Sequence, residues 1–547
     1  MVKRRFGSAV LLFVTALVAS SLVVVTPAAA VPDAPPGIDL EIYTGQVDAA
    51  GIQEIRELGV DPAEVTADSA ADPAAATEVE AVLSPVQAAK LKSAGVDLQV
   101  KTVDGVAASQ VLRAQAAEGW QAFRPYGTPG GIKDELWAAG GAHRNIAKVV
   151  KVGTTVKGQE ILAVKVTKDA NRVRDGRRPS VLYASDQHAR EWITPEMTRR
   201  LMHHVLDNYG KDREITKLVD TTELWFLPVA NPDGYDFTFT EGNRLWRKNL
   251  RDNNGDGQTT VGDGVDLNRN FAVKWGYDNE GSSPDPSSDT YRGPGPNSEP
   301  ETKALDGLFR RVGFEFFINY HSAAELLLHG IGWQVSTPSP DDVLYEAMVG
   351  TDNNSAIPGY DPDLSAELYT TNGDTDTHAQ VKYGTLGFTP EMSTCEAASE
   401  SVPDDQWLAE DCVSGFIFPD DESLIQAEFV KNIPFALAVA KSAQDPDDPV
   451  SVVGLDAADL VADPFTASYG RDQTVAVTAK RSLRNVEVNY SINNGRTRTK
   501  QVREWRGGER YGDTNNDYYG EFRATIRANP GDQVKVWFTG RNTGRGG

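Results

Sequence analysis

Residues 180–210 read SVLYASDQHAREWITPEMTRRLMHHVLDNYG, and this stretch decides the predicted fold. Its first part, SVLYASD, is a short apolar run typical of a buried strand. Its last part, TPEMTRRLMHHVLDNYG, is typical of a helix that stops at a glycine. A strand that leads directly into a helix is one unit of an α/β domain, and the loop between them carries a histidine, an arginine and a glutamate.

The same alternation continues through about residues 120–443. It predicts an α/β domain with a mixed, mostly parallel sheet that is flanked by helices. Chemically active side chains should then lie in loops at the strand ends. The strand-like runs include ILAVKVT, SVLYASD, TELWFLPVAN and FEFFINYH, and a further helical stretch is EPETKALDGLFRRVG.

Two strand ends in this domain carry side chains that can bind a metal. His188 follows the first strand, Glu191 comes three residues later, and His321 ends the run FEFFINYH. A lone histidine is more often structural than a ligand. A hydrolytic zinc site, however, needs three ligands of the histidine and glutamate type and one open position for water, and these residues supply that set.

Seven motifs spread over this domain extend the pattern. They are HAREWIT, NPDGY, NRLWRKN, GVDLNRNF, NYHS, ELYTTNG and GFTPEM. In this order and at these spacings they resemble the zinc carboxypeptidases of the carboxypeptidase A/B type, and the chain looks like a secreted bacterial member. No single motif is decisive, but together they cover most of the domain. The resemblance implies the family's fold and a metallocarboxypeptidase, which releases single C-terminal amino acids from peptides.

The resemblance assigns the reaction centre to four residues. It places one Zn²⁺ on His188, Glu191 and His321, with a zinc-bound water as the nucleophile. It makes Glu391, in GFTPEM, the general base for this water. The chemistry agrees, because zinc lowers the pKa of its water toward neutrality, and a nearby carboxylate can then take the proton and pass it to the leaving amine.

Five further residues are assigned to the substrate by the same resemblance. Arg247 would take part in catalysis by polarising the scissile carbonyl and stabilising the oxyanion, and Arg244 could share the substrate end. Asn268 and Arg269, in DLNRN, would hold the free C-terminal carboxylate, because a guanidinium matches its two oxygens. Tyr369 would close over the bound residue and donate a hydrogen bond. This grip on a free carboxylate is what makes an exopeptidase.

The chain departs from the family pattern at two points. The residue before His188 is Gln187, in a segment that opens with Ser185 and Asp186. No ligand is lost there. His378 stands where relatives often carry an aromatic side chain, so the wall of the substrate pocket is less certain than the zinc site.

The floor of the substrate pocket is predicted to be acidic. Counting without gaps from Tyr369, the resemblance puts Asp376 where relatives specific for basic residues carry an aspartate, and Asp374 lies two residues earlier. A buried carboxylate favours lysine or arginine through a charge-assisted hydrogen bond, while Leu328 and Leu364 would keep the walls apolar. We therefore expect a basic preference, or a dual preference for basic and hydrophobic residues. The alternative is that one aspartate caps the turn in NGDTDTH and points away.

The stretch DNNGDGQTTVGD at residues 252–263 predicts a second metal ion. Its polar side chains fall at the positions of a calcium-binding loop, although the last is aspartate rather than glutamate and flanking helices are not evident. The alternative is a polar turn rich in aspartate and asparagine. The candidate calcium ligands are Asp252, Asn254, Asp256, Gln258 and Asp263.

The N-terminus has the pattern of an export signal. Lys3 and two arginines precede a long apolar run, and the small residues in TPAAA suggest cleavage after Ala30. The prediction is a signal peptide at residues 1–30 and a secreted protein, with an uncleaved N-terminal anchor as the alternative. No other segment is apolar enough to span a membrane.

Residues 31–118 form a region of their own, rich in alanine and glutamate. Strands are expected at residues 39–45, 78–83 and 96–100 and helices at residues 48–59 and 84–95. A small α/β unit between a signal and a larger domain is interpreted as an inhibitory prosegment, with an ordinary accessory domain as the alternative. Arg113 is a candidate site for its removal by a trypsin-like protease.

The chain changes again after the predicted catalytic domain, residues 119–445. QTVAVTAK, NVEVNYSIN, GEFRATI and DQVKVWFTG alternate as strands do, around turns rich in glycine and asparagine. They predict a β-sandwich-like accessory module at residues 446–547. It contains no titratable cluster that suggests catalysis.

Only two cysteines occur, Cys395 and Cys412. In an exported chain an even number of cysteines favours a disulfide, and two buried thiols are the alternative. The count excludes a cysteine-rich metal site.

The composition and motifs together limit the partners. A formal net charge of -24, without a sustained run of lysine and arginine, argues against nucleic acid, because neutralising phosphates needs a basic face. The expected substrates are C-termini of peptides or proteins, and the expected processed form is a monomer.

Two other functions stay open. One is a related zinc amidase that trims cell-wall peptides, against which Asn268 and Arg269 argue; the other is a binding protein on an inactive peptidase scaffold, against which the complete ligand set and Glu391 argue.

Overall fold

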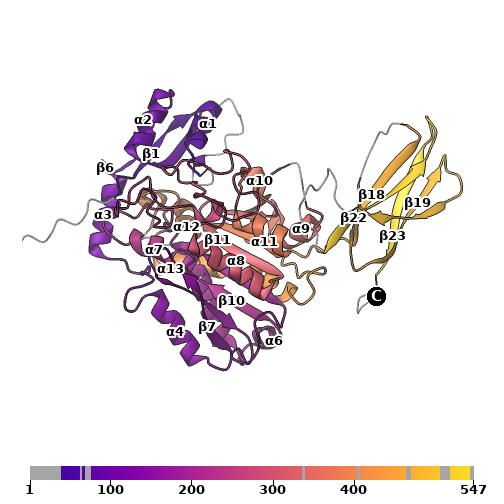
Figure 1. Ribbon diagram of the computed structural model, residues 1–547, viewed down its shortest axis with the longest axis horizontal. Helices are drawn as coiled ribbons and strands as arrows, with labels where there is room; N and C mark the ends of the chain where they lie inside the picture. Colours follow the sequence, from indigo (N-terminus) through magenta and orange to yellow (C-terminus); the bar gives the residue numbers. More distant parts are fainter. Residues whose placement is uncertain are drawn as a thin grey trace, which may run out of the picture. The chain divides into compact units, whose positions relative to one another are not determined.

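The computed structural model describes residues 38–61, 65–67, 76–335, 339–402, 407–463, 470–505 and 518–542. The predicted signal peptide, residues 1–30, lies outside these parts. Within them, no helix is long and apolar enough to cross a membrane. Figure 1 labels the elements along the chain, with the N-terminal section in indigo and the C-terminal strands in yellow.

The described N-terminal section contains a four-stranded antiparallel sheet, the two-stranded sheet β5-β6 and three helices. The strand order is β2-β3-β1-β4. Ser84 caps helix α2 and Pro85 begins it, as the sequence predicts. The elements of this section are β1 Glu41–Val47, α1 Ala49–Glu57, β2 Thr66–Ala67, β3 Thr77–Leu83, α2 Pro85–Ser93, β4 Gln99–Val100, β5 Thr102–Val103, β6 Val106–Ala107 and α3 Ala108–Glu118.

The middle section contains the predicted mixed sheet, with eight strands in the order β15-β12-β16-β11-β9-β10-β8-β7. The four central strands, from β16 to β10, are parallel, whereas β7, β8 and β12 each join an antiparallel neighbour. The fold prediction is confirmed. The strands are β7 Ala147–Thr154, β8 Glu160–Val166, β9 Ser180–Ser185, β10 Glu223–Leu227, β11 Phe316–Ser322, β12 Leu326–His329, β15 Asp361–Leu364 and β16 Leu386–Met392.

Helices cover both faces of this sheet. Val181 and Tyr183 of β9 pack into one apolar core with side chains of α5 and α13, whereas Leu182 and Ala184 pack into a second core with α8. A strand buried on both faces is apolar throughout, which explains the run SVLYAS. The helices and short elements are α4 Ile132–Ala142, α5 Ile193–Asn208, α6 Arg213–Thr221, α7 Pro232–Thr238, η2 Leu267–Arg269, α8 Pro300–Val312, α9 Asp342–Val349, β13 Gly350–Thr351, β14 Asn354–Ser355, α10 Ser365–Leu368, α11 Thr375–Tyr383, α12 Cys395–Ser401, η3 Ala409–Asp411 and α13 Glu422–Ser442.

The carboxyl ends of three parallel strands meet at one edge of the sheet. β9 ends at Ser185, just before His188, and its neighbour β11 contains His321. On the other side of β11, Glu391 of β16 is the direct partner of His321 in the ladder. The strand order therefore brings residues from three distant parts of the chain together, as expected for an α/β sheet.

The C-terminal section consists of two small sheets, β17-β18-β22-β21 and β20-β19-β23, that share one apolar core. This arrangement is the predicted β-sandwich-like module. The backbone N–H groups of Tyr518 and Tyr519 donate to Asp341, at the start of α9. The strands are β17 Leu460–Ala462, β18 Asp472–Lys480, β19 Arg484–Ile492, β20 Arg498–Gln501, β21 Arg503–Glu504, β22 Tyr519–Arg527 and β23 Val534–Arg541.

Candidate metal centre

The three predicted zinc ligands converge at the edge of the sheet. Nδ1 of His188 lies 2.7 Å from Oε1 of Glu191 and 3.1 Å from Nδ1 of His321, which is itself 3.1 Å from Oε2 of Glu191. Tetrahedral zinc with Zn–N distances of about 2.0–2.1 Å separates its ligands by about 3.3 Å, so this donor set fits the ion. All three side chains are buried. Among the described residues they form the one group of three or more His, Cys, Asp or Glu side chains that could hold a metal.

A carboxylate outside the predicted set orients the first ligand. Oδ1 of Asp266 lies 3.1 Å from Nε2 of His188, and its Oδ2 accepts from Nη2 of Arg247 at 2.9 Å. Burial opposes ionisation, but the neighbouring Arg247 and His188 hold the pKa of Asp266 well below its usual range. An ionised Asp266 that accepts from Nε2 leaves Nδ1 of His188 free for a metal. The only sequence signal for Asp266 is its place in GVDLNRNF.

Glu391 faces the ligands from the neighbouring strand. Its ladder partner on β11 is His321, and its side chain is 7% exposed. Burial raises the pKa of Glu391 well above its usual range, and the carboxylates of Glu191 and Asp61 add to the effect. A buried carboxylate beside the ligand set would be a candidate general base for the hydrolytic water.

The carboxylate of Asp61, from the predicted prosegment, lies between two of the predicted substrate-binding arginines. Nη2 of Arg247 and Nη2 of Arg269 both donate to its Oδ2, the latter at 2.9 Å. Arg269 also donates to the hydroxyl of Tyr369 at 3.2 Å. Burial opposes the charge, but the two arginines hold the pKa of Asp61 below its usual range. No local pattern in the sequence marks Asp61, because its partners lie about two hundred residues away.

Arg244 is buried in the same region but contacts a different set of groups. Its guanidinium lies 3.7 Å from the ring centroid of Trp192, and its Nη1 donates to the carbonyl of Arg190 at 2.7 Å. These contacts support the segment that carries Glu191. A direct role of Arg244 in substrate binding stays a prediction.

The two aspartates of the predicted pocket floor have different surroundings. Asp374 caps helix α11 by accepting from the N–H of Thr377 at 2.8 Å and from the hydroxyl of Thr371 at 3.0 Å. Asp376 accepts from Nδ2 of Asn319 at 3.1 Å through one oxygen, and burial raises its pKa to about 7. The capping alternative thus describes Asp374, while Asp376 keeps an oxygen free.

The remaining residues of the predicted pocket have separate contacts. Oδ1 of Asn268 accepts from both the N–H and the hydroxyl of Thr375. Leu328 is buried and Leu364 is half-buried. His378, the departure noted in the sequence, lies 2.7 Å from Asp306 through Nε2 and so ties α11 to α8.

The carboxylates of the predicted calcium loop turn onto their own backbone. Asp252 accepts from the N–H groups of Gly255 and Gly257, and Asp263 accepts from the N–H and hydroxyl of Thr260. In the same loop Asp256 accepts from Asn254 and Gln258. Across the described chain no metal-binding group of three such side chains includes them. Calcium binding at this loop is not tested by this geometry, but the local hydrogen bonds favour the alternative of a polar turn.

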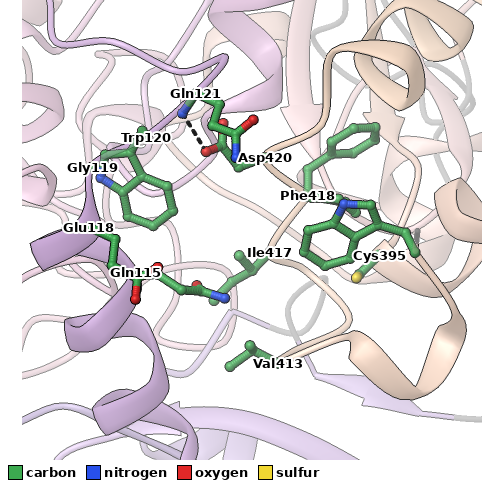
Figure 2. A pocket seen from close by; sticks show the side chains of 12 residues that line it. Gln115, Glu118, Gly119, Trp120, Gln121, Cys395, Val413, Ile417, Phe418 and Asp420 are labelled. Atoms are coloured by element: carbon green, nitrogen blue, oxygen red, sulfur yellow. Dashed lines mark hydrogen bonds between the residues drawn. The ribbon is translucent and has the colours of Figure 1, made fainter.

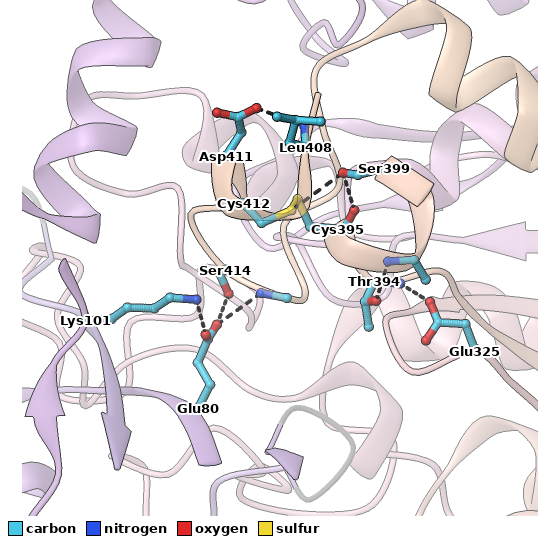
Figure 3. Close-up of a disulfide and its surroundings, with 12 residues drawn as sticks. Glu80, Lys101, Glu325, Thr394, Cys395, Ser399, Leu408, Asp411, Cys412 and Ser414 are labelled. Carbon is cyan, nitrogen blue, oxygen red and sulfur yellow. Dashed lines mark hydrogen bonds and ion pairs between the residues drawn. A yellow bond between two sulfur atoms is a disulfide. The ribbon is translucent and has the colours of Figure 1, made fainter. Parts of the chain in front are cut away.

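The predicted disulfide between Cys395 and Cys412 is present, with a Cα–Cα distance of 5.8 Å. Figure 3 shows that the chain just after it reaches the N-terminal section. The hydroxyl of Ser414 and the N–H of Gly415 donate to Glu80, which also pairs with Lys101. The disulfide therefore fixes the segment that Glu80 contacts.

Comparison with known proteins agrees with this geometry. Residues 132–428, more than half of the chain, match the family model for zinc carboxypeptidase. The chain belongs to the zinc carboxypeptidase family.

The relatives found by sequence cover part of this region. A metallocarboxypeptidase A-like protein of Trichophyton verrucosum is 37% identical over 211 residues, 38% of this chain and 46% of the relative. Mast cell carboxypeptidase A of Mus musculus is 35% identical over 213 residues, 38% of this chain and 48% of the relative. The chain thus spans about half the length of the curated relatives it matches.

Solved structures agree in fold. The crystal structure of thrombin activatable fibrinolysis inhibitor has a TM-score of 0.55 at 20% identity and covers 74% of this chain and 99% of its own. Carboxypeptidase A from Helicoverpa armigera also has a TM-score of 0.55, at 22% identity, and covers 74% of this chain and 98% of its own.

Proposed function

We propose that the protein is a secreted, zinc-dependent metallocarboxypeptidase that releases single amino acids from the C-termini of peptides. The observation that carries this proposal is the convergence of three buried zinc ligands beside one carboxylate and two buried arginines. Membership of the zinc carboxypeptidase family supports it. Secretion rests on the predicted signal peptide at residues 1–30.

The ligand set would hold one Zn²⁺, which when bound lowers the pKa of water and polarises a carbonyl. His188 and His321 offer Nδ1 to the ion and Glu191 offers its carboxylate. Glu391 takes the proton from the attacking water and delivers it to the nitrogen of the leaving amino acid. A bound Zn²⁺ would place positive charge beside Glu391, which would lower its raised pKa and favour the carboxylate that a general base needs.

The arginines would supply the charge that the substrate needs. Arg247 is held by Asp266 in a buried site, so its guanidinium can stabilise the negative charge that develops on the scissile carbonyl oxygen. Arg269 and the side-chain amide of Asn268 would bind the free C-terminal carboxylate, and Tyr369 would close over the terminal residue. An internal peptide bond offers no carboxylate to this end of the cleft, so we infer an exopeptidase.

The contacts of Asp61 support a latent form of the enzyme, in which the prosegment occupies the substrate site. Its carboxylate lies between Arg247 and Arg269, where the carboxylate of a substrate would bind. Its loop is held in place, because Ser288 and Thr290 donate to the carbonyl of Gly59, two residues earlier. We infer that residues 31–118 are a prosegment that blocks the substrate site until it is removed.

The predicted cleavage site, Arg113, lies inside helix α3 near the end of the prosegment. A cavity of about 180 Å³ separates the end of α3 from the apolar residues after the disulfide, as Figure 2 shows. Just beyond it, the N–H groups of Gln121 and Ala122 donate to Asp420 at 2.7 and 2.8 Å. A cut in α3, for instance after the exposed Arg113, would leave the start of the catalytic domain bound at Asp420. This supports a catalytic domain at residues 119–445.

The pocket supports a basic or dual preference for the released residue. Asp376 is the candidate partner of an arginine or lysine side chain, since one of its buried oxygens accepts no hydrogen bond from a described residue. A charge-assisted hydrogen bond there is worth about 1.5–3 kcal/mol. Leu328 and the half-buried Leu364 leave room for apolar residues as well.

A peptide ladder read by mass tests the proposed function. The trimmed protein should shorten ordinary peptides one C-terminal residue at a time, stop after chelation, and recover with added Zn²⁺. The control is a cell-wall peptide whose scissile bond does not release a single C-terminal residue. Cleavage of that control alone would show an amidase, and zinc binding without cleavage of either would show an inactive scaffold.

A further inference from the structure

A chain of hydrogen bonds joins the two ends of the substrate cleft, and Gln187 lies at its centre. Gln187 is 2% exposed. Its Nε2 donates to the hydroxyl of Thr375 at 2.8 Å, and its Oε1 accepts from Nδ2 of Asn319 at 3.1 Å. Thr375 leads to Asn268, at the carboxylate-binding end, and Asn319 leads to Asp376, at the pocket floor.

The two ends of this chain fix its direction. The backbone N–H of Thr375 donates to Oδ1 of Asn268 at 2.9 Å, so the oxygen of Asn268 faces this chain of hydrogen bonds, which we call the relay. At the other end, Nδ2 of Asn319 lies 3.1 Å from Asp376 and donates to it when that group is ionised, because a carboxylate only accepts. Gln187 joins both ends because its terminal amide carries one donor group and one acceptor. The hydroxyl of Thr375 lies 2.8 Å from Nε2 and 3.0 Å from Oε1 of Gln187, and when it donates to Asn268 at 2.8 Å it accepts from Nε2.

This direction leaves different groups free at the two ends. The Nδ2 group of Asn268 donates no hydrogen bond to a described residue, so it is available to a carboxylate. Both N–H groups of Asn319 are used, by Gln187 and by Asp376. Oδ1 of Asn319 and Oδ1 of Asp376 are buried and accept no hydrogen bond from the described chain. Free acceptors on two hydrogen-bonded side chains match a group that only donates, such as a guanidinium or an ammonium.

We propose that Gln187 is a positioning residue for substrate selection. By orienting Asn319 and, through Thr375, Asn268, it turns donors toward the terminal carboxylate of the substrate and acceptors toward a basic side chain. Asn319 then supplies a second acceptor beside Asp376. The inference rests on the proposed carboxypeptidase activity and specifies how this chain recognises a basic terminal residue.

The first test replaces Gln187 by methionine, which has a similar volume but cannot carry the relay. For peptides that differ only in a terminal Arg or Leu, the Gln187→Met variant should lower the Arg-to-Leu ratio of kcat/KM by about tenfold, since one oriented charge-assisted bond is lost. The change should appear mainly in KM. Zinc content is measured on each variant, because a structural role next to His188 would lower zinc binding and leave the ratio unchanged.

A second pair of variants keeps the test decisive if Gln187→Met does not fold. Thr375→Val removes the hydroxyl at constant shape, and Thr375→Ser keeps it. The Val variant should raise KM for both peptides relative to the Ser variant, because Asn268 loses its orientation. Equal KM values for these two variants, or an Arg-to-Leu ratio in Gln187→Met equal to that of the native enzyme, would overturn the proposal.

These experiments distinguish a failure of the proposed carboxypeptidase activity from a failure of the Gln187 relay. If the native protein cleaves no peptide, the carboxypeptidase assignment fails and this inference fails with it. If the native protein prefers Arg and Asp376→Asn removes that preference, but Gln187→Met keeps it, the relay alone is wrong.

Discussion

The metal centre and the loop at residues 252–263 both gather acidic side chains, but they use them in opposite ways. At the metal centre, carboxylate and imidazole groups from two strand ends point at one another, with their ligand atoms all within 4.8 Å. In the loop, Asp252 and Asp263 accept hydrogen bonds from N–H groups a few residues away. A site built from distant segments can hold its donors apart from their own backbone, whereas a short loop satisfies its carboxylates locally.

The largest effect should appear at the metal centre, as a fall in kcat on mutation of Glu391. Glu391→Gln should lower kcat by about 10²–10⁴-fold, the usual contribution of a general base, while zinc content stays at one per chain. Zinc content by mass spectrometry and kcat are measured on the same sample. His188→Ala is the matched control and should lose both zinc and activity. A loss of zinc in Glu391→Gln would show that Glu391 is a ligand.

The next largest effect concerns Asp61, the carboxylate from the prosegment. Asp61→Ala removes the prosegment carboxylate from Arg247 and Arg269, although Asp266 still pairs with Arg247, and removing one side of a buried ion pair costs about 3–5 kcal/mol. The uncut variant should therefore hydrolyse peptides at least about 100-fold faster than the uncut native chain, measured before any protease is added. Glu57→Gln, an exposed acid in the same section, should leave the native latency intact. Full activity in the uncut native chain would refute the prosegment.

A smaller effect tests the pocket floor through pH. Burial raises the pKa of Asp376 to about 7, so the carboxylate gains its charge, and its attraction for a basic side chain, as the pH rises through that value. The Arg-to-Leu ratio of kcat/KM should rise about tenfold from pH 6 to pH 8, because titrations shared by both substrates cancel in the ratio. In Asp376→Asn the ratio should be low and independent of pH. A ratio that falls with rising pH would contradict the assignment.

The smallest expected effect belongs to the acidic loop. Because its carboxylates are already hydrogen-bonded, millimolar Ca²⁺ should leave the Tm of the zinc-loaded protein unchanged. An ion held at about 100 times its Kd would add about 2.7 kcal/mol of stability and raise the Tm clearly. Such a rise, absent in Asp252→Asn, would show that the loop is a calcium site and that the two regions are alike.

Much of this arrangement could be predicted from local sequence. The strand–loop–helix unit around His188, the capped helix at Ser84 and the disulfide all depend on residues whose chemistry acts nearby, and each is present as expected. The roles of Asp374 and Asp376 needed the structure, since a shift of one residue exchanges a capping aspartate for a pocket aspartate.

Contacts over long distances in the chain could not be predicted unless the family motifs marked both residues, as they did for His188 and His321. Asp61 resembles any other aspartate until the fold brings it between Arg247 and Arg269. Asp266 stood in a recognised motif, but its contact with His188 depends on where two separate loops meet. The antiparallel edges of the sheet likewise follow from strand order rather than from strand sequence.

The most direct measurement compares one peptide as its free acid and as its C-terminal amide, with the trimmed, zinc-loaded protein. The account requires a free carboxylate for Arg269 and Asn268, so the acid should lose single residues and the amide should react at least about tenfold more slowly. Glu391→Gln should cleave neither. Equal cleavage of acid and amide, or release of internal fragments, would contradict the assignment of this site to a carboxypeptidase.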